Sequence, residues 1–376
     1  MERFIYADNA ATTKLDIDAF EAMKPYLLDE YGNASQPYSF ARKPKQALKE
    51  ARKIIARCIN AEPDEIYFTS GGTESDNWAI KGTLFASKDK KATITSSFEH
   101  HAIIHTCEVM ERLGYPVVYI NPNNTGVVTP NALDAIITPQ TLLVSIMMSN
   151  NEIGTIQPIK KLTEIAHRNG AIFHTDAVQC VGHISIDVKK LNVDMLSASA
   201  HKFNGPKGIG FIYIKNGTPI SSLLHGGSQE KMYRAGTENI AAIVGMAVAL
   251  QKNCTELEEN KKHLVKLENT LLSTLESNGV SFIQNGTGER VPGNLSLSFP
   301  GFEGETLLHR LDLMGIIVST GSACDSVNTQ ISHVLRAINT DEKIARGTLR
   351  ISFGKENTID DAKNIAISLN KIIANN

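Results

Sequence analysis

The apolar positions between residues 45 and 215 follow two alternating patterns. Short uninterrupted apolar runs predict buried strands, and apolar residues spaced three or four apart, as in 103–113 and 159–166, predict helices. The predicted strands cover residues 65–69, 92–95, 117–120, 142–148, 171–175, 195–198 and 210–214. Strands that alternate with helices predict an α/β fold with a mostly parallel sheet flanked by helices. A ligand of such a sheet is expected outside the carboxyl ends of the strands.

The pattern changes after about residue 240. A long helical region runs from 240 towards 277, strand-like segments follow at 295–299 and 349–353, and an amphipathic helix begins at 359. The chain has 376 residues, which exceeds the roughly 250–300 residues at which single cores stop growing. We therefore expect a large domain over residues 15–255 and a smaller α+β domain formed by residues 1–14 and 256–376.

The charge balance and the spacing of the cysteines argue against several classes of protein. The 38 Lys and Arg residues nearly balance the 40 Asp and Glu residues, so no general footprint for nucleic acid is present. The longest apolar stretch, 240–250, is shorter than the ~20 residues needed to span a membrane. The five cysteines are far apart and form no CxxC pair. This spacing argues against a disulfide framework or a zinc site and favours a reducing cytoplasm, with no metal cofactor.

Three segments at predicted strand ends carry candidate chemistry. Gly71, Gly72 and Thr73 lie between a strand and a helix, where backbone N–H groups can bind a phosphate. Asp176 ends an apolar strand, and Lys202 follows another. Each has an ordinary alternative: a simple turn, a helix N-cap and a surface lysine. Together they are typical of a pyridoxal phosphate site, which needs an anion cradle, a lysine that binds the cofactor covalently and an acid at the ring nitrogen.

A fourth segment contains Cys324 among small, polar, turn-forming residues. A thiol in such a setting can act as a nucleophile when its thiolate is populated. The alternative is a free surface cysteine without a role. The other cysteines lie on patterned or apolar segments and are expected to be spectators.

The order of motifs along nearly the whole chain resembles the cysteine desulfurases of the NifS/IscS type. These enzymes belong to the class V aminotransferase superfamily, with the fold of type I pyridoxal phosphate enzymes. The resemblance is carried by the segments 7–13, 31–35, 69–77, 99–100, 150–154, 176–179, 201–208, 234–237 and 321–324.

The resemblance implies a role for each matching residue at the cofactor. Lys202 would bind pyridoxal 5'-phosphate covalently and move the substrate's protons, and Asp176 would pair with the ring nitrogen. His100 would stack on the ring and take part in acid–base steps. The remaining cofactor ligands implied are Gly72, Thr73, Gln179, Ser199, His201 and, across the interface of a homodimer, Thr237.

The resemblance also implies the reaction. Asn151 and Arg350 would hold the carboxylate of L-cysteine; the alternative for Arg350 is an edge-strand salt bridge. Cys324 would take the sulfur as a persulfide, L-alanine would be released, and the sulfur would pass to an acceptor protein such as a scaffold or a thiolation enzyme. That acceptor serves iron–sulfur cluster assembly or thio-modification, and neither nucleic acid nor membrane is a direct partner.

Other functions stay open at this point. Within the superfamily, the chain could be a selenocysteine lyase or another class V enzyme, and outside it a sulfur-relay or cofactor-binding scaffold. Residues 325–332 depart from the usual family pattern, so the sequence does not identify the acceptor or the pathway.

Overall fold

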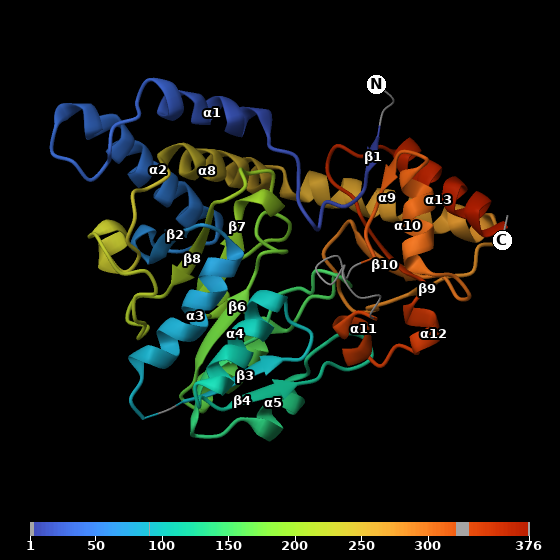
Figure 1. Ribbon diagram of the computed structural model, residues 1–376, viewed down its shortest axis with the longest axis horizontal. Helices are drawn as coiled ribbons and strands as arrows, with labels where there is room; N and C mark the ends of the chain where they lie inside the picture. The colour runs from blue at the N-terminus through green and yellow to red at the C-terminus, as the bar shows by residue number, and fades with distance from the viewer. Residues whose placement is uncertain (1–3, 90, 321–330, 375–376) are drawn as a thin grey trace.

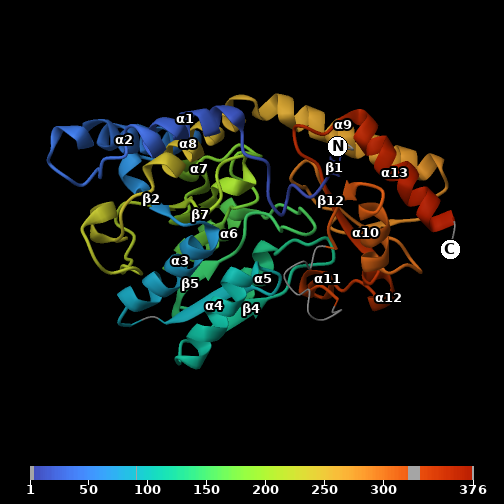
Figure 2. The same ribbon diagram turned by 45° about the horizontal axis from the view of Figure 1, so that its top comes forward.

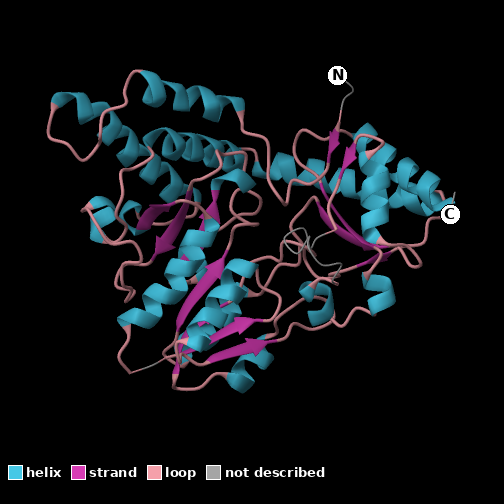
Figure 3. Cartoon of the chain, in the orientation of Figure 1, coloured by secondary structure: helices cyan, strands magenta, loops and turns pink. Residues whose placement is uncertain are grey.

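The structure is a computed structural model that describes residues 4–89, 91–320 and 331–374 (Figure 1). The described residues form a seven-stranded sheet and, beside it, a second unit with a smaller sheet (Figure 3). Both ends of the described chain lie in the second unit. Among the described residues, we find no helix with the length and apolar character required to cross a membrane.

The seven-stranded sheet has a mostly parallel order. Its strands, in spatial order, are β2 (Ile66–Thr69), β8 (Gly210–Ile214), β7 (Met195–Ser199), β6 (Ile172–Asp176), β5 (Thr141–Ser145), β3 (Ala92–Ser96) and β4 (Val117–Ile120). β8 is antiparallel to β2 and β7, and the other neighbouring pairs are parallel. The predicted α/β fold class is confirmed, and each predicted strand is present with shifts of a few residues at its ends.

Helices cover both faces of this sheet. They are α1 (Ile17–Leu28), α2 (Arg42–Cys58), α3 (Gly72–Ala86), α4 (His101–Arg112), α5 (Pro130–Ile136), α6 (Ile159–Arg168), α7 (Val188–Leu191) and α8 (Ile240–Thr255). Because side chains alternate along a strand, Val144 and Leu196 pack in a core with α2, α6 and α8. Their neighbours Leu143 and Met195 pack instead with α3 and α4.

The second unit has its own hydrophobic core, except that the segment 333–345 packs on the core of the large sheet. Its elements are β1 (Ile5–Tyr6), α9 (Leu257–Ser277), β9 (Ile283–Gln284), β10 (Asn294–Ser298), α10 (Gly304–Asp312), β11 (Ile316–Ile317), α11 (His333–Ala337), α12 (Glu342–Ala345), β12 (Thr348–Ser352) and α13 (Ile359–Ala374). Antiparallel β12, β10 and β9 form one sheet, and β1 pairs with β11. α9 packs along α13 (Figure 2). The predicted helical region 240–277 is two helices that meet at Glu256.

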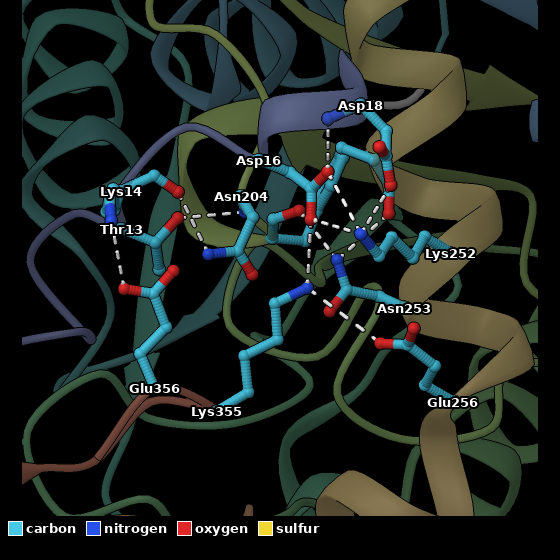
Figure 4. A network of polar contacts seen from close by, with 12 residues as sticks. Thr13, Lys14, Asp16, Asp18, Asn204, Lys252, Asn253, Glu256, Lys355 and Glu356 are labelled. Atoms are coloured by element: carbon cyan, nitrogen blue, oxygen red, sulfur yellow. Dashed lines mark hydrogen bonds and ion pairs between the residues drawn. The ribbon is translucent and has the colours of Figure 1, made fainter. Parts of the chain in front are cut away.

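A buried carboxylate joins the two units. Asp16 caps α1 by accepting a hydrogen bond from Asp18 N (2.9 Å). Its Oδ2 also lies 3.0 Å from Lys252 Nζ on α8 and 3.2 Å from Lys355 Nζ after β12 (Figure 4). Burial acts to raise the pKa of Asp16, but these hydrogen bonds outweigh it and lower the pKa. The network therefore ties the chain after β12 to α1 and α8.

Candidate active site

A cavity of about 540 Å³ opens at the carboxyl ends of the parallel strands. Asp176 ends β6 and Ser199 ends β7, and both line it, as does the beginning of α3. The second unit contributes Arg350 from β12. The cavity thus lies where the strand pattern places the ligand of a parallel sheet.

Most of the predicted site residues meet in this cavity. Those that line it are Gly72, Thr73, His100, Asn151, Asp176, Gln179, Ser199, His201, Lys202 and Arg350. Thr237 lies before α8 and is not among the residues that line the cavity in the described part of the chain. Cys324 lies outside the described residues.

The beginning of α3 forms one wall. From the sequence, Gly72 and Thr73 were expected between the strand and the helix, but α3 already begins at Gly72 with Gly71 as its N-cap, so Thr73 lies in the first turn. The first N–H groups of a helix have no partner within it, and the helix dipole favours an anion there. A Cβ on Gly72 would lie 2.6 Å from Val178 Cγ2, so the close approach of α3 to the segment after β6 requires glycine.

An ion pair fixes this helix start. Glu74 accepts a hydrogen bond from Ser70 N (2.8 Å) and binds Arg234 through both carboxylate oxygens, at 2.8 and 3.1 Å. Burial acts to raise the pKa of Glu74, and the bonds from Arg234 and Ser70 lower it. Since Arg234 is three residues before Thr237, the pair connects the α3 wall to the predicted interface segment.

Lys202 follows β7 in a 3-10 turn (Ala200–Lys202). Its Nζ donates hydrogen bonds to the carbonyl oxygens of Ala10 (2.5 Å) and Ala11 (2.8 Å). Gln179 Nε2 also donates to Ala10 O, at 3.0 Å, and His201 Nδ1 lies 3.1 Å from Thr12 Oγ1. The N-terminal segment therefore holds the lysine and its neighbours at the cavity.

Asp176 forms part of the cavity floor. It is 6% exposed, and its Oδ1 accepts a hydrogen bond from Val178 N at 2.9 Å. Burial raises its pKa to about 6, although the Val178 bond and the charge of Lys202 act in the opposite direction. A cation placed beside Asp176 would stabilise its ionised form.

Two further carboxyls near this floor are buried. Burial and the charge of Asp176 raise the pKa of Asp76, and its Oδ1 has no hydrogen-bond partner among the described residues. Burial raises the pKa of Glu99 to about 8, against bonds from Ser96 and Met147 N. The sequence analysis gave neither carboxyl a role, because their burial depends on the packing of α3 and α4 on the sheet.

His100 is the N-cap of α4. Its Nδ1 accepts a hydrogen bond from Ala102 N at 3.1 Å, which leaves the proton of the neutral ring on Nε2. Burial, followed by the charge of Lys202, lowers its pKa to about 4. His100 is therefore neutral at physiological pH.

Two histidines that the sequence analysis gave no role also line the cavity. The rings of His101 and His333 are 4.9 Å apart, and His333 Nε2 lies 2.9 Å from Glu99 O. His101 follows His100 directly in the sequence, which was the available signal. His333 comes from α11 of the second unit, so only the docking of the two units brings it here.

Arg350 forms the opposite wall and is 4% exposed. Its Nη2 donates to Asp8 Oδ1 at 2.7 Å, and its Nη1 donates to Asn151 O at 3.1 Å. The salt bridge considered as the alternative for this residue therefore exists, while Arg350 also lines the cavity. Asp8 belongs to one of the quoted motifs but was given no role of its own.

Comparisons with known proteins agree with this arrangement. The aminotransferase class-V family model matches residues 5–365. Cysteine desulfurase IscS of Methanosarcina thermophila is 48% identical over 96% of this chain and 90% of its own length. Cysteine desulfurase IscS of Dictyoglomus turgidum is 46% identical over 99% of this chain and 95% of its own length.

Two solved structures are also similar to this chain. A NifS-like protein has a TM-score of 0.93 at 37% identity, with all of both chains covered. SspA, solved in complex with cysteine, has a TM-score of 0.84 at 35% identity, with 94% of this chain and all of its own covered. Proteins of this family generally depend on pyridoxal phosphate. The resemblance found in the sequence is confirmed: the chain belongs to the aminotransferase class-V family and, within it, to the cysteine desulfurases.

Proposed function

We propose that the protein converts L-cysteine to L-alanine with pyridoxal 5'-phosphate and passes the sulfur to Cys324. The main support for this proposal is that Lys202, Asp176 and the start of α3 line one cavity, opposite the buried Arg350. The relatives named cysteine desulfurase and the complex of SspA with cysteine support the same substrate.

The residues around the cavity fit pyridoxal phosphate. The N–H groups at the start of α3, with Thr73, Ser199 and His201, would hold the phosphate. Asp176 would face the protonated ring nitrogen, whose charge favours the ionised carboxylate. Gln179 would hydrogen-bond the ring hydroxyl, and Lys202 would bind the cofactor covalently. The Cβ clash at Gly72 shows how closely α3 approaches this site.

Each wall has a separate part in the reaction. The bound cofactor supplies an electron sink for the negative charge that develops at the α-carbon of the amino acid. Asp176 keeps the ring nitrogen protonated, and Lys202 removes and returns the α-carbon proton. His100 would stack on the ring and, with its proton on Nε2, would present that N–H to the reacting groups in the acid–base steps. Arg350 and Asn151 orient the substrate through its carboxylate.

Cys324 would complete the reaction as the sulfur acceptor. Its thiolate attacks the substrate sulfur, so that the carbon–sulfur bond of L-cysteine breaks and a sulfur–sulfur bond forms. The thiol of Cys324 becomes a persulfide, and the substrate carbon skeleton takes up a proton and leaves as L-alanine. The persulfide sulfur would then pass to an acceptor protein of iron–sulfur cluster assembly or thio-modification.

We further propose a homodimer in a reducing cytoplasm. Thr237 is connected to the helix start through Arg234 and Glu74 and, as the family resemblance implies, would reach the phosphate bound in the partner subunit. The cysteine spacing favours a reducing cytoplasm.

The test is alanine release from L-cysteine under a thiol reductant by cofactor-loaded wild type and Cys324→Ser. We expect release by the wild type and a loss of at least about 100-fold in the variant, because the sulfur has no acceptor. Cys107→Ser, in a buried core cysteine, is the control and should retain activity. Equal release by wild type and Cys324→Ser would contradict the proposal, as would turnover of selenocysteine but not of L-cysteine.

A further inference from the structure

The buried guanidinium of Arg350 is held from two directions. Nη2 donates to Asp8 Oδ1 (2.7 Å) and Nη1 to Asn151 O (3.1 Å). The side chain of Arg350 is 4% exposed and that of Asp8 is 17% exposed. A guanidinium has five N–H donors in a rigid plane. Two anchors at different nitrogens therefore fix the plane and leave further donors for a ligand.

One of the remaining donors has no partner. Nε of Arg350 is buried and makes no hydrogen bond to any described residue, and Arg350 lines the cavity. A buried donor without a partner is costly in a folded protein. A planar acceptor pair such as a carboxylate matches the fork of a guanidinium.

The backbone around Asp8 fixes it against the same strand as Arg350. Ser352 N donates to Ala7 O (2.8 Å), Asn9 N donates to Ser352 O (3.0 Å) and Ala10 N donates to Ser352 Oγ (2.9 Å). Asp8 is thus set two residues along β12 from Arg350, although 342 residues separate the two in sequence. The pairing of residues 7–10 with β12 therefore holds Asp8 within hydrogen-bond reach of Arg350.

We propose that Asp8 is a positioning residue that orients Arg350 to recognise the carboxylate of the amino-acid substrate. This inference deepens the proposed function, on which it rests for the role of Arg350. The ligand class is an α-amino acid with a free carboxylate, and Asp8 itself does not touch it. An amide or ester of the same amino acid lacks the second anionic oxygen and is bound weakly.

The charge of Asp8 has two opposing effects. As an acceptor it fixes the guanidinium, and as an anion it repels the incoming carboxylate. Loss of a charge-assisted hydrogen bond is expected to lower affinity roughly 10- to 150-fold. The orienting effect dominates because a carboxylate needs two N–H groups at fixed positions. Asparagine separates the two effects, since it keeps an oxygen acceptor and removes the charge.

The test compares cofactor-loaded wild type, Asp8→Ala and Asp8→Asn, with Lys14→Gln as a control in the same segment. Lys14 pairs with Glu356 at the surface, where both side chains are more than half exposed. In Asp8→Ala we expect KM for L-cysteine to rise at least about 10-fold, with kcat within about threefold. In Asp8→Asn and Lys14→Gln, KM should lie within about threefold of wild type or, for Asp8→Asn, below it.

A binding measurement without turnover separates this inference from the proposed function. Calorimetry with 3-mercaptopropionate and with its amide should show a wild-type preference for the acid of at least about 10-fold, reduced to below about threefold in Asp8→Ala. The visible absorbance of the bound cofactor should stay unchanged. An unchanged KM and acid preference in Asp8→Ala would overturn the inference, as would an Asp8→Asn variant as impaired as Asp8→Ala. A wild type that prefers the acid but releases no alanine would contradict the proposed function alone.

Discussion

The two walls of the cavity differ in how the chain builds them. On the cofactor wall, the functional residues lie at or shortly after the ends of strands of one sheet, as Asp176 and Lys202 do, although Lys202 bonds to the distant segment 10–11. On the substrate wall, Arg350 is held by Asp8 and by Asn151, residues 342 and 199 positions away. The positions of the residues on the first wall follow from the order of strands in one sheet, and the second wall requires the two units to dock.

This difference leads to a general expectation. Changes on the cofactor wall should affect cofactor affinity and the chemical step, whereas changes at the junction of the units should affect substrate recognition. Variants at the two walls and at the junction test this contrast.

The largest effect is expected at Lys202. Lys202→Ala would remove both the proposed covalent attachment of the cofactor and the group proposed to move the α-carbon proton, and proton transfer alone contributes about 10²–10⁴-fold. We expect alanine release to fall about 1,000-fold, with an unchanged circular dichroism spectrum. Lys215→Ala, which removes a surface bond to Asn192, is the control and should keep full activity. More than a tenth of wild-type activity in Lys202→Ala would be inconsistent with the role of this lysine.

A smaller effect is expected at the junction. Asp16→Ala removes the cap of α1 and the shared acceptor of Lys252 and Lys355. The loss of a cap and of a charged acceptor should lower the free energy of unfolding by about 2 kcal/mol, measured by urea titration. Because Lys355 follows β12, KM for L-cysteine should rise by a larger factor than the dissociation constant of pyridoxal phosphate.

The control for Asp16 is an exposed ion pair on the same helix. Lys24→Gln removes the partner of Glu21 and should change the unfolding free energy by less than about 0.5 kcal/mol. If Asp16→Ala changed cofactor affinity but not KM, the junction would not support the substrate wall.

The remaining prediction concerns the pH dependence of stability rather than activity. Burial raises the pKa of Glu99 from 4.5 to about 8. A raised pKa in the folded state means that the contribution of Glu99 to stability is present below about pH 4.5 and is lost as the pH rises towards 8. In thermal melts between pH 5 and pH 8, Glu99→Gln should therefore gain stability relative to wild type as the pH rises. A constant difference between the two proteins would show that Glu99 does not titrate in this range.

The contrast between the walls also explains what the sequence could predict. Asp176 and Lys202 stand out because strand ends are visible in the apolar pattern, and the family motifs point to the same residues. The pairing of Asp8 with Arg350 and the place of His333 depend on contacts between distant segments. The direction of β8 and the burial of Asp76 likewise depend on how strands and helices pack, which periodicity does not encode.

The most direct test of the two-wall account measures cofactor affinity and KM for L-cysteine in Asp176→Ala and Arg350→Lys. Lysine keeps the charge but lacks the planar fork of a guanidinium. We predict that Asp176→Ala raises the dissociation constant of pyridoxal phosphate at least about 10-fold and shifts its absorbance, because the partner of the ring nitrogen is lost. Arg350→Lys should raise KM at least about 10-fold and leave cofactor affinity and absorbance unchanged. A comparable loss of cofactor affinity in both variants would contradict the division of the cavity into two walls.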